Sequence, residues 1–122
     1  MKDWKEITLE ISDSLEKAIS VLHYGGLRVA LVVDKKNRLL GTITDGDIRR
    51  ALLKYQGMDS SVEVIMNNNP IVAQSSDSKE VVMLKMKSRD LLHIPITDEN
   101  NQLIGLETLQ HLTYDKRYDN PV

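Results

Sequence analysis

A short polar segment, Thr44-Asp45-Gly46-Asp47, holds residue types from which a catalytic or binding site could be built. Two carboxylates this close together are the kind of pair that general acid–base catalysis uses. Residues 48–53 continue as a helix pattern, however, so both carboxylates would lie at an exposed helix start, where the helix dipole favours negative charge. A helix cap explains the segment without any reaction. The segment alone therefore predicts no acid–base pair.

The other side chains that could do chemistry are His93 and His111, which could be a pair of metal ligands. A third ligand is not apparent, and the chain contains no cysteine, which excludes thiolate chemistry, disulfides and cysteine metal sites. No serine stands in a nucleophile elbow, and no phosphate-binding loop with its lysine is present. We therefore predict neither an enzyme nor a resident metal or required cofactor.

Composition limits the partners. The 122 residues suffice for one compact domain or two small halves, and the net charge of −2 does not suggest a nucleic-acid-binding face. Apolar runs are shorter than the roughly 20 residues of a membrane span, and the N-terminal residues lack the apolar stretch of a signal peptide. These features predict a cytoplasmic protein. An apolar set without Phe, rich in Val, Ile and Leu, suits a sheet-containing core.

An internal repeat sets the organisation of the chain. When the sequence is shifted by 64 residues, so that Ile71 falls on Ile7, eleven identities appear without a gap. Many are turn or cap residues rather than interchangeable apolar ones, which argues against chance. The identical residues in the first copy are Ile7, Ser12, Asp13, Ser14, Glu16, Leu27, Asp34, Asn37, Leu39, Gly41 and Thr44.

Each copy predicts the same order of elements, β-α-β-β-α. Asp13 with Glu16, and Asp77 with Glu80, have the spacing of capping boxes that begin helices, and Gly25-Gly26 ends the first helix. The expected strands are 7–9, 29–33 and 39–42 in the first copy and 71–73, 94–96 and 103–106 in the second. One such unit is too small to bury its own sheet, so we expect an α/β (α+β) fold in which two units pack sheet to sheet with pseudo-twofold symmetry. The boundaries are 1–66 for the first repeat and 67–122 for the second repeat with its C-terminal tail.

The motif from Leu39 to Ile48, LLGTITDGDI, preceded by Val32-Val33-Asp34 and a polar turn, resembles the CBS domain, named after cystathionine β-synthase. Residues 94–98 and 103–105 repeat part of this pattern. The resemblance implies a paired (Bateman) module that binds AMP, ADP or ATP in a cleft between the repeats, regulates an attached enzyme and often forms a dimer.

The segment Thr44-Asp45-Gly46-Asp47-Ile48-Arg49-Arg50 further resembles CBS pairs attached to sugar-phosphate nucleotidyltransferases and sugar-phosphate isomerases. Because the pair starts at Met1 here, and residues 118–122 resemble the lead-in to a transferase, the expected partner is a nucleotidyltransferase domain beyond the C-terminus.

The resemblance also implies roles for single residues. Asp47 matches the ribose-binding carboxylate, and Thr44 matches a phosphate or ribose contact. The alternative is that both residues only cap the helix, and capping is compatible with binding. Gly46 would allow a close approach to the backbone, and Asp45 is a weaker candidate because it would repel phosphate. The remaining candidates are Ile7 and Thr8 for the adenine slot, Arg28 and His93 for phosphate, and Thr108 in the second copy.

The second copy departs from the pattern, since His111 stands where Asp47 stands in the first, and a histidine cannot accept a ribose diol as a carboxylate does. Arg49 and Arg50 are expected to be exposed helix residues or contacts to a partner chain. The rival hypothesis is a structural dimerisation module without a physiological ligand.

Overall fold

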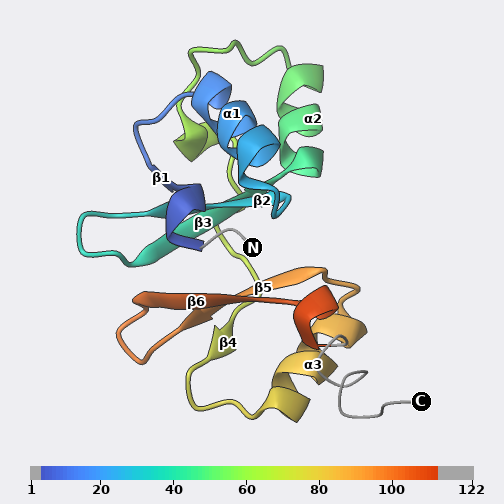
Figure 1. Ribbon diagram of the computed structural model, residues 1–122. Helices are drawn as coiled ribbons and strands as arrows, with labels where there is room; N and C mark the ends of the chain where they lie inside the picture. Colours follow the sequence, from blue (N-terminus) through green and yellow to red (C-terminus); the bar gives the residue numbers. More distant parts are fainter. Residues whose placement is uncertain (1–3, 113–122) are drawn as a thin grey trace. The chain divides into compact units, whose positions relative to one another are not determined.

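The computed structural model describes residues 4–112 and separates into two compact units between Pro70 and Ile71 (Figure 1). Residues 118–122, which supported the prediction of a following transferase domain, lie outside the described residues. Among the described residues, no helix combines the length and apolar character needed to cross a bilayer.

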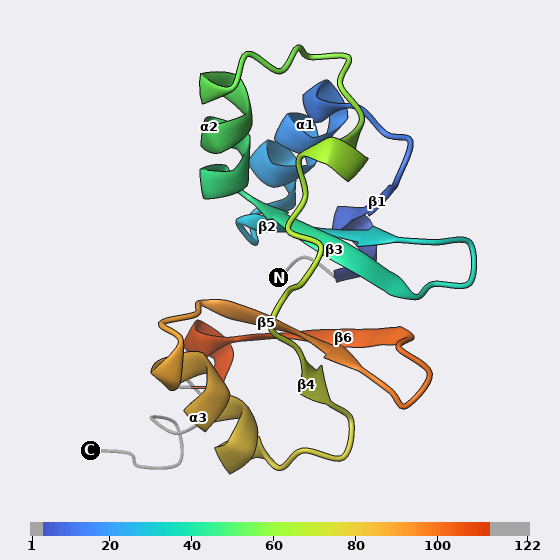
Figure 2. The ribbon, with the colours of Figure 1, turned by 180° about the vertical axis from the view of Figure 1, so that it is seen from behind.

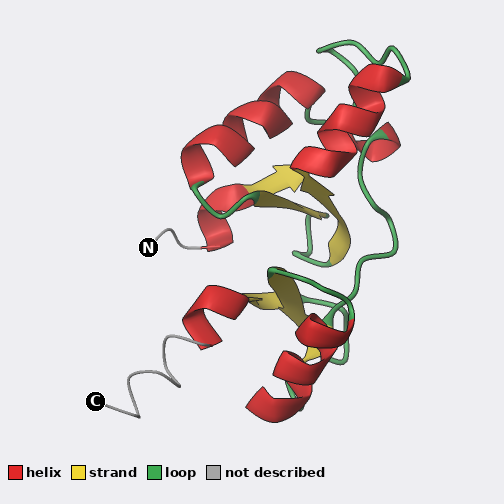
Figure 3. Ribbon diagram, turned by 90° about the vertical axis from the view of Figure 1, so that its right-hand side faces the viewer, coloured by secondary structure: helices red, strands yellow, loops and turns green. Residues whose placement is uncertain are grey.

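The first unit is a three-stranded sheet covered on one face by two helices (Figures 1 and 3). The strand order is β1-β2-β3, with β1 parallel and β3 antiparallel to β2. Its elements are η1 (Trp4–Ile7), β1 (Thr8–Glu10), α1 (Leu15–Gly25), β2 (Val29–Val33), β3 (Leu39–Thr44), α2 (Asp45–Leu53) and η2 (Val62–Val64). The core between sheet and helices is aliphatic, built around Leu9, Leu15, Ala30, Val32 and Ile43.

The second unit repeats this plan. Its elements are β4 (Ala73–Gln74), α3 (Lys79–Ser88), β5 (His93–Thr97) and β6 (Leu103–Thr108), and residues 109–112 are helical at the end of the described chain. The sheet order is β4-β5-β6, again parallel and then antiparallel. Val82, Met86 and Leu112 pack with Ala73 and Ile94 in its core. The fold class predicted from sequence, a mixed fold of two tandem repeats, is confirmed; the predicted packing of the two sheets on each other stays a prediction.

The 64-residue repeat is visible in individual hydrogen bonds. Asp34 Oδ1 accepts from the backbone N–H groups two and four residues later, and Asp98 Oδ1 does the same at the matching turn. Asn37 and Asn101 within these turns both have left-handed backbone, with φ of 63° and 62°. Asparagine tolerates this conformation better than most residues, which explains its presence in both copies.

The predicted helix starts are wrong by one residue. The N-caps of α1 and α3 are Ser14 and Ser78, whose hydroxyls accept from the backbone N–H three residues later. Asp13 does not cap the helix, because its Oδ2 accepts from the backbone N–H of Glu10 at 2.8 Å. In the second unit, Oδ2 of Asp77 likewise accepts from the backbone N–H of Gln74 at 2.9 Å. The carboxylates thus close the loop between strand and helix.

The two glycines predicted to end α1 do so for different reasons. Gly26 is the C-cap and has φ of 76°, a left-handed conformation that favours glycine. Gly25 is required by packing, since a Cβ on it would lie 2.5 Å from Cγ2 of Ile7.

The predicted first strands were placed too early. Ile7 is fully buried but lies in η1 rather than in a strand, because strand pairing with β2 begins only at Thr8. In the second copy, pairing with β5 begins only at Ala73.

Candidate functional site

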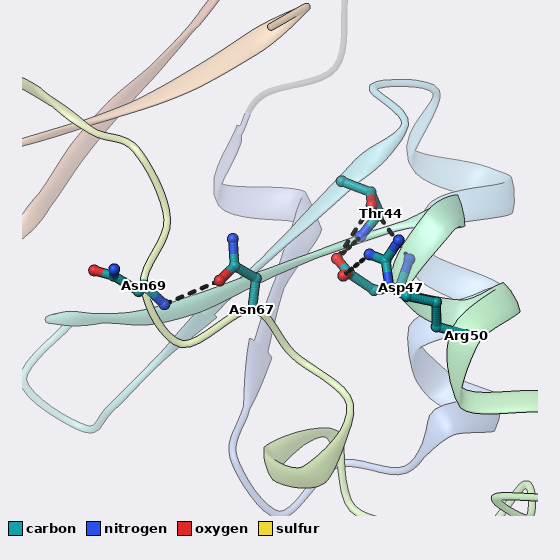
Figure 4. Close-up of polar contacts among 5 residues, drawn as sticks. All are labelled: Thr44, Asp47, Arg50, Asn67 and Asn69. Atoms are coloured by element: carbon teal, nitrogen blue, oxygen red, sulfur yellow. Dashed lines mark hydrogen bonds and ion pairs between the residues drawn. The ribbon is translucent and has the colours of Figure 1, made fainter. Parts of the chain in front are cut away.

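The start of α2 is the best-organised polar group among the candidate residues (Figure 4). Thr44 ends β3 with an extended backbone and is the N-cap of α2. Its hydroxyl accepts from the backbone N–H of Asp47 at 3.4 Å, while Asp47 Oδ2 accepts from Thr44 N at 2.9 Å and from Thr44 Oγ1 at 3.1 Å. This is a complete capping box, so the capping interpretation is confirmed, and it fixes the Asp47 carboxylate in one orientation.

Arg50 joins the polar group formed by Thr44 and Asp47, a role that was not predicted from the sequence. Its Nη2 lies 2.6 Å from Oδ1 of Asp47, so both carboxylate oxygens have partners. The Asp47 side chain is only 11% exposed, whereas that of Arg50 is 65% exposed. The sequence did contain one indication of this ion pair: Asp47 and Arg50 are three residues apart on one helix, so their side chains lie on the same side of it.

A cavity of about 400 Å³ opens beside this group, within the first unit. Its walls are one face of α2 and the segment that follows η2, and Figure 2 shows this segment passing β3 on its way out of the unit. Asn67 is held there by two backbone hydrogen bonds with Thr42, of 3.1 and 2.9 Å. The lining residues are Asp47, Arg50, Ala51, Lys54, Gln56, Val64, Ile65, Met66 and Asn67. Only Asp47 among them was a sequence candidate; Asn67 was missed because its partner Thr42 is distant in the sequence.

The two residues between Thr44 and Asp47 occupy the first turn of α2. Asp45 is exposed. Gly46 lies beside the Arg50 guanidinium, and a Cβ added to it would meet Nη1 at 3.5 Å and Thr44 Oγ1 at 3.7 Å. These are ordinary contact distances, so the fold itself does not require glycine at this position.

The other candidates of the first repeat, Arg28, Thr8 and Ile7, lie near the end of the sheet where Thr44 lies, but they do not line the cavity. Val29 pairs with Thr44 and Leu31 pairs with Thr8, so Arg28, just before β2, and Thr8 lie at the end of the sheet where β3 finishes. Because β1 and β3 flank β2, Thr8 is two strand spacings, about 10 Å, from β3. The exposed Arg28 has a left-handed φ of 63°. The side chain of Ile7 is fully buried, so it offers no side-chain surface to a ligand.

In the second unit the matching positions form a different group. His93 of β5 pairs in register with Thr108 of β6, so the structure brings these two candidates together. Thr108 Oγ1 accepts from the backbone N–H of His111 at 3.0 Å, which repeats the threonine cap of the first unit. His111 Nδ1 lies 2.7 Å from Oε1 of Glu107, so its ring is turned to a carboxylate on the preceding strand.

Two carboxyl groups outside this site have perturbed pKa values. Backbone N–H groups, chiefly that of Arg38, lower the pKa of Asp34, and the backbone N–H of Gln74 followed by the Lys85 ammonium lowers the pKa of Asp77. The shift of Asp34 arises within its turn, whereas that of Asp77 also depends on Lys85 of α3. Within residues 4–112, no group of three or more His, Asp or Glu side chains is arranged to hold a metal ion.

Comparison with known proteins assigns both units to one protein family. The family model described as "CBS domain" matches residues 2–54 and again residues 62–112. A curated relative, arabinose 5-phosphate isomerase GutQ of Salmonella typhimurium, is 32% identical over 104 residues, which are 82% of this chain and 31% of that protein. The chain spans about a fifth to a third of the length of the curated relatives it matches.

Solved structures agree with the fold. A structure of CBSX2 in complex with AMP has a TM-score of 0.83 at 19% identity and covers 99% of this chain and 95% of that one. A CBS domain pair of protein MJ0100, in complex with 5′-methylthioadenosine and S-adenosyl-L-methionine, has a TM-score of 0.77 at 25% identity, with 90% of each chain covered. With the family matched twice along the chain and the fold shared, this protein belongs to the CBS domain family as a tandem pair of CBS repeats.

Proposed function

We propose that the chain is a regulatory module without catalytic activity that binds an adenine nucleotide, AMP, ADP or ATP, at the start of α2. The observation that carries this proposal is the Asp47 carboxylate, fixed by Thr44 and only 11% exposed, at the wall of a cavity of about 400 Å³. Cavities that hold small ligands have volumes of roughly 300–1,000 Å³. The relatives solved with AMP and with two adenosyl compounds support the choice of ligand class.

The chemistry of the group suits a nucleoside. A carboxylate accepts hydrogen bonds from both hydroxyls of a ribose, and a carboxylate that is already oriented pays little entropy to do so. The N-terminal N–H groups of α2 and the nearby Arg50 and Lys54 are suited to a phosphate. The apolar wall made by Ala51, Ile65 and Met66 gives an adenine ring a surface to pack on.

The test is calorimetric titration of the chain with AMP, ADP, ATP and S-adenosylmethionine. We expect one nucleotide per chain, because only the first unit has the carboxylate, and Asp47→Ala should weaken binding at least tenfold, since hydrogen bonds to a charged group contribute about 1.5–3 kcal/mol. Asp47→Ala also removes a helix cap, so Ser14→Ala, which removes the cap of α1 away from the cavity, is the matched control. Equal losses in the two variants, or no binding of any nucleotide by the unaltered chain, would refute the proposal.

The enzyme under control is proposed to be a sugar-phosphate nucleotidyltransferase, and the module is proposed to act in the cytoplasm as a homodimer. The resemblance of residues 44–50 supports a sugar-handling partner, and the isomerase relative shares that chemistry. Binding would regulate such a partner only if the nucleotide has different affinities for two states of the protein.

A structural dimerisation module remains the second candidate. It is favoured by exposed apolar side chains at and after the end of α2, where Leu53 is 72% exposed and Tyr55 is 95% exposed. The same titration separates the two, because a dimer that binds no adenosyl compound would support this candidate alone.

A further inference from the structure

The carboxylate proposed to accept the ribose is already occupied. Asp47 Oδ2 accepts two hydrogen bonds from Thr44, and Oδ1 is paired with Arg50 Nη2 at 2.6 Å. A carboxylate has about four acceptor positions, and these three bonds leave one free, so a ribose that donates both of its hydroxyls to Asp47 must displace one partner. This inference rests on the proposed function and concerns what the displaced arginine does.

Arg50 is the partner that can move. Its side chain is 65% exposed, whereas Asp47 is 11% exposed and tied to the backbone of Thr44. Gly46 carries no side chain, and a Cβ there would already be in contact distance of both guanidinium nitrogens, so the glycine leaves room beside Arg50. The guanidinium can leave Asp47 without disturbing the helix cap.

The cavity offers this guanidinium a new position. Arg50 of α2 and Lys54, the C-cap residue of this helix, are four residues apart and so face the same side. Both line the cavity, with Asn67 on the opposite wall. Lys54 makes no ion pair within the part of the chain that the structure describes. When Arg50 leaves Asp47, two cations face the cavity, an arrangement that favours a dianionic phosphate.

We propose that the part of this cavity beside Arg50 and Lys54 is the phosphate subsite and that Arg50 transfers its ion pair from Asp47 to the phosphate when a nucleotide binds. For a phosphorylated ligand, the phosphate replaces the carboxylate as the partner of Arg50. Adenosine, which has no phosphate, must displace Arg50 without compensation, and S-adenosylmethionine brings a positive charge next to Arg50 and Lys54. The site thus selects nucleotides against unphosphorylated and cationic adenosyl compounds.

The test compares AMP, adenosine and S-adenosylmethionine by calorimetry on the unaltered chain, on Arg50→Gln and on Arg49→Gln. Arg49 is the neighbouring exposed arginine of α2 and does not line the cavity, so its variant controls for loss of one positive charge. We expect Arg50→Gln to reduce the preference for AMP over adenosine by about ten- to a hundredfold, the range of one charge-assisted hydrogen bond. AMP affinity itself should fall by less, because in the unaltered chain AMP only exchanges one ion pair of Arg50 for another. The same variant should bind adenosine more tightly than the unaltered chain, whereas Arg49→Gln should change neither affinity by more than about twofold.

A fall in AMP affinity together with a rise in adenosine affinity in Arg50→Gln distinguishes this inference from a merely structural role of Arg50. If AMP and adenosine affinities fall together in Arg50→Gln, or if the unaltered chain binds the two equally, the inference is wrong while the proposed function stands. If the unaltered chain binds no adenosyl compound, both are wrong. Circular dichroism melting of each variant ensures that the comparison is made on folded protein, and Arg50→Lys, which keeps the charge, should retain most of the preference for AMP.

Discussion

Gly41 of β3 lies against the segment that forms one wall of the cavity, and this close approach can be tested. A Cβ on Gly41 would lie 2.7 Å from the carbonyl oxygen of Asn67 and 2.7 Å from Sδ of Met66. Met66 is flexible and can move, but the carbonyl of Asn67 is fixed because it accepts from Thr42 N at 3.1 Å while Asn67 N donates to Thr42 O at 2.9 Å. Gly41→Ala must therefore push the segment away from the sheet.

The expected cost follows from these contacts. Losing both backbone hydrogen bonds costs about 1–3 kcal/mol in all, at roughly 0.5–1.5 kcal/mol each. Overpacking of a buried site costs a similar amount, typically about 1–3 kcal/mol. We therefore expect Gly41→Ala to lower the free energy of unfolding of the first unit by about 2–4 kcal/mol, since the two effects share the same displacement.

The repeat supplies a matched control. Gly105 of β6 is the equivalent position in the second unit, where, among residues 4–112, an added Cβ would meet only Ile96 side-chain atoms at 3.8 and 3.9 Å. Gly105→Ala should thus be neutral or slightly stabilising. Urea unfolding followed by fluorescence of the only tryptophan, Trp4, reports on the first unit, and circular dichroism reports on the whole chain. Equal destabilisation by the two variants would show that the close approach at Gly41 is not what requires glycine.

Two further predictions concern the site and the second unit. Gly46→Ala should leave the free energy of unfolding unchanged or raise it by up to about 1 kcal/mol, because the added methyl group fits and alanine favours a helix. AMP affinity, measured by calorimetry, should nevertheless fall severalfold. An unchanged affinity would show that no ligand approaches the backbone at Gly46. Asp77→Asn tests the lowered pKa of Asp77, whose stabilising contribution is present above the ordinary value of 3.8 and is lost as pH falls through the lower folded-state pKa. The variant should therefore be less stable than the unaltered chain near neutral pH, and this difference should shrink below pH 3.8 in urea unfolding at several pH values; a difference independent of pH would contradict this origin.

The sequence predicted those features whose cause is local or periodic. Apolar runs on either side of the turn residues Asp34 and Asn37 located the strands that became β2 and β3, and the recurrence of these residues 64 positions later located β5 and β6. The segment at Thr44 predicted the start of α2 for the same reason, since a capping box is formed by neighbours in the chain. Where two neighbouring side chains could both cap a helix, the sequence did not show which one does. Asp13 was assigned as the cap of α1, but its carboxylate accepts from the backbone N–H of Glu10, and the neighbouring Ser14 caps the helix instead.

The cavity wall could not be predicted, for a similar reason. Nothing in the local sequence of Asn67 indicates that it pairs with Thr42, because the pairing depends on how the segment after α2 returns to the sheet. Arg50 could have been found from its spacing to Asp47, yet on an exposed helix that spacing is equally common between side chains that merely face solvent. Its importance becomes apparent only with Asp47 fixed by Thr44 and only 11% exposed.

The two repeats share a backbone but differ in the chemistry at the start of their last helices. Thr44 and Thr108 both accept from the N–H three residues later, so the helix starts are equivalent in geometry. In the first unit the residue at that third position is a carboxylate that also bonds back to the threonine, whereas in the second it is His111, which turns to Glu107 instead. Because a cap needs only the threonine, the second unit keeps its fold without a diol acceptor. The requirements of the fold and those of a diol acceptor are thus separable at this position, and for this reason we propose the nucleotide site in the first unit although both units are CBS repeats.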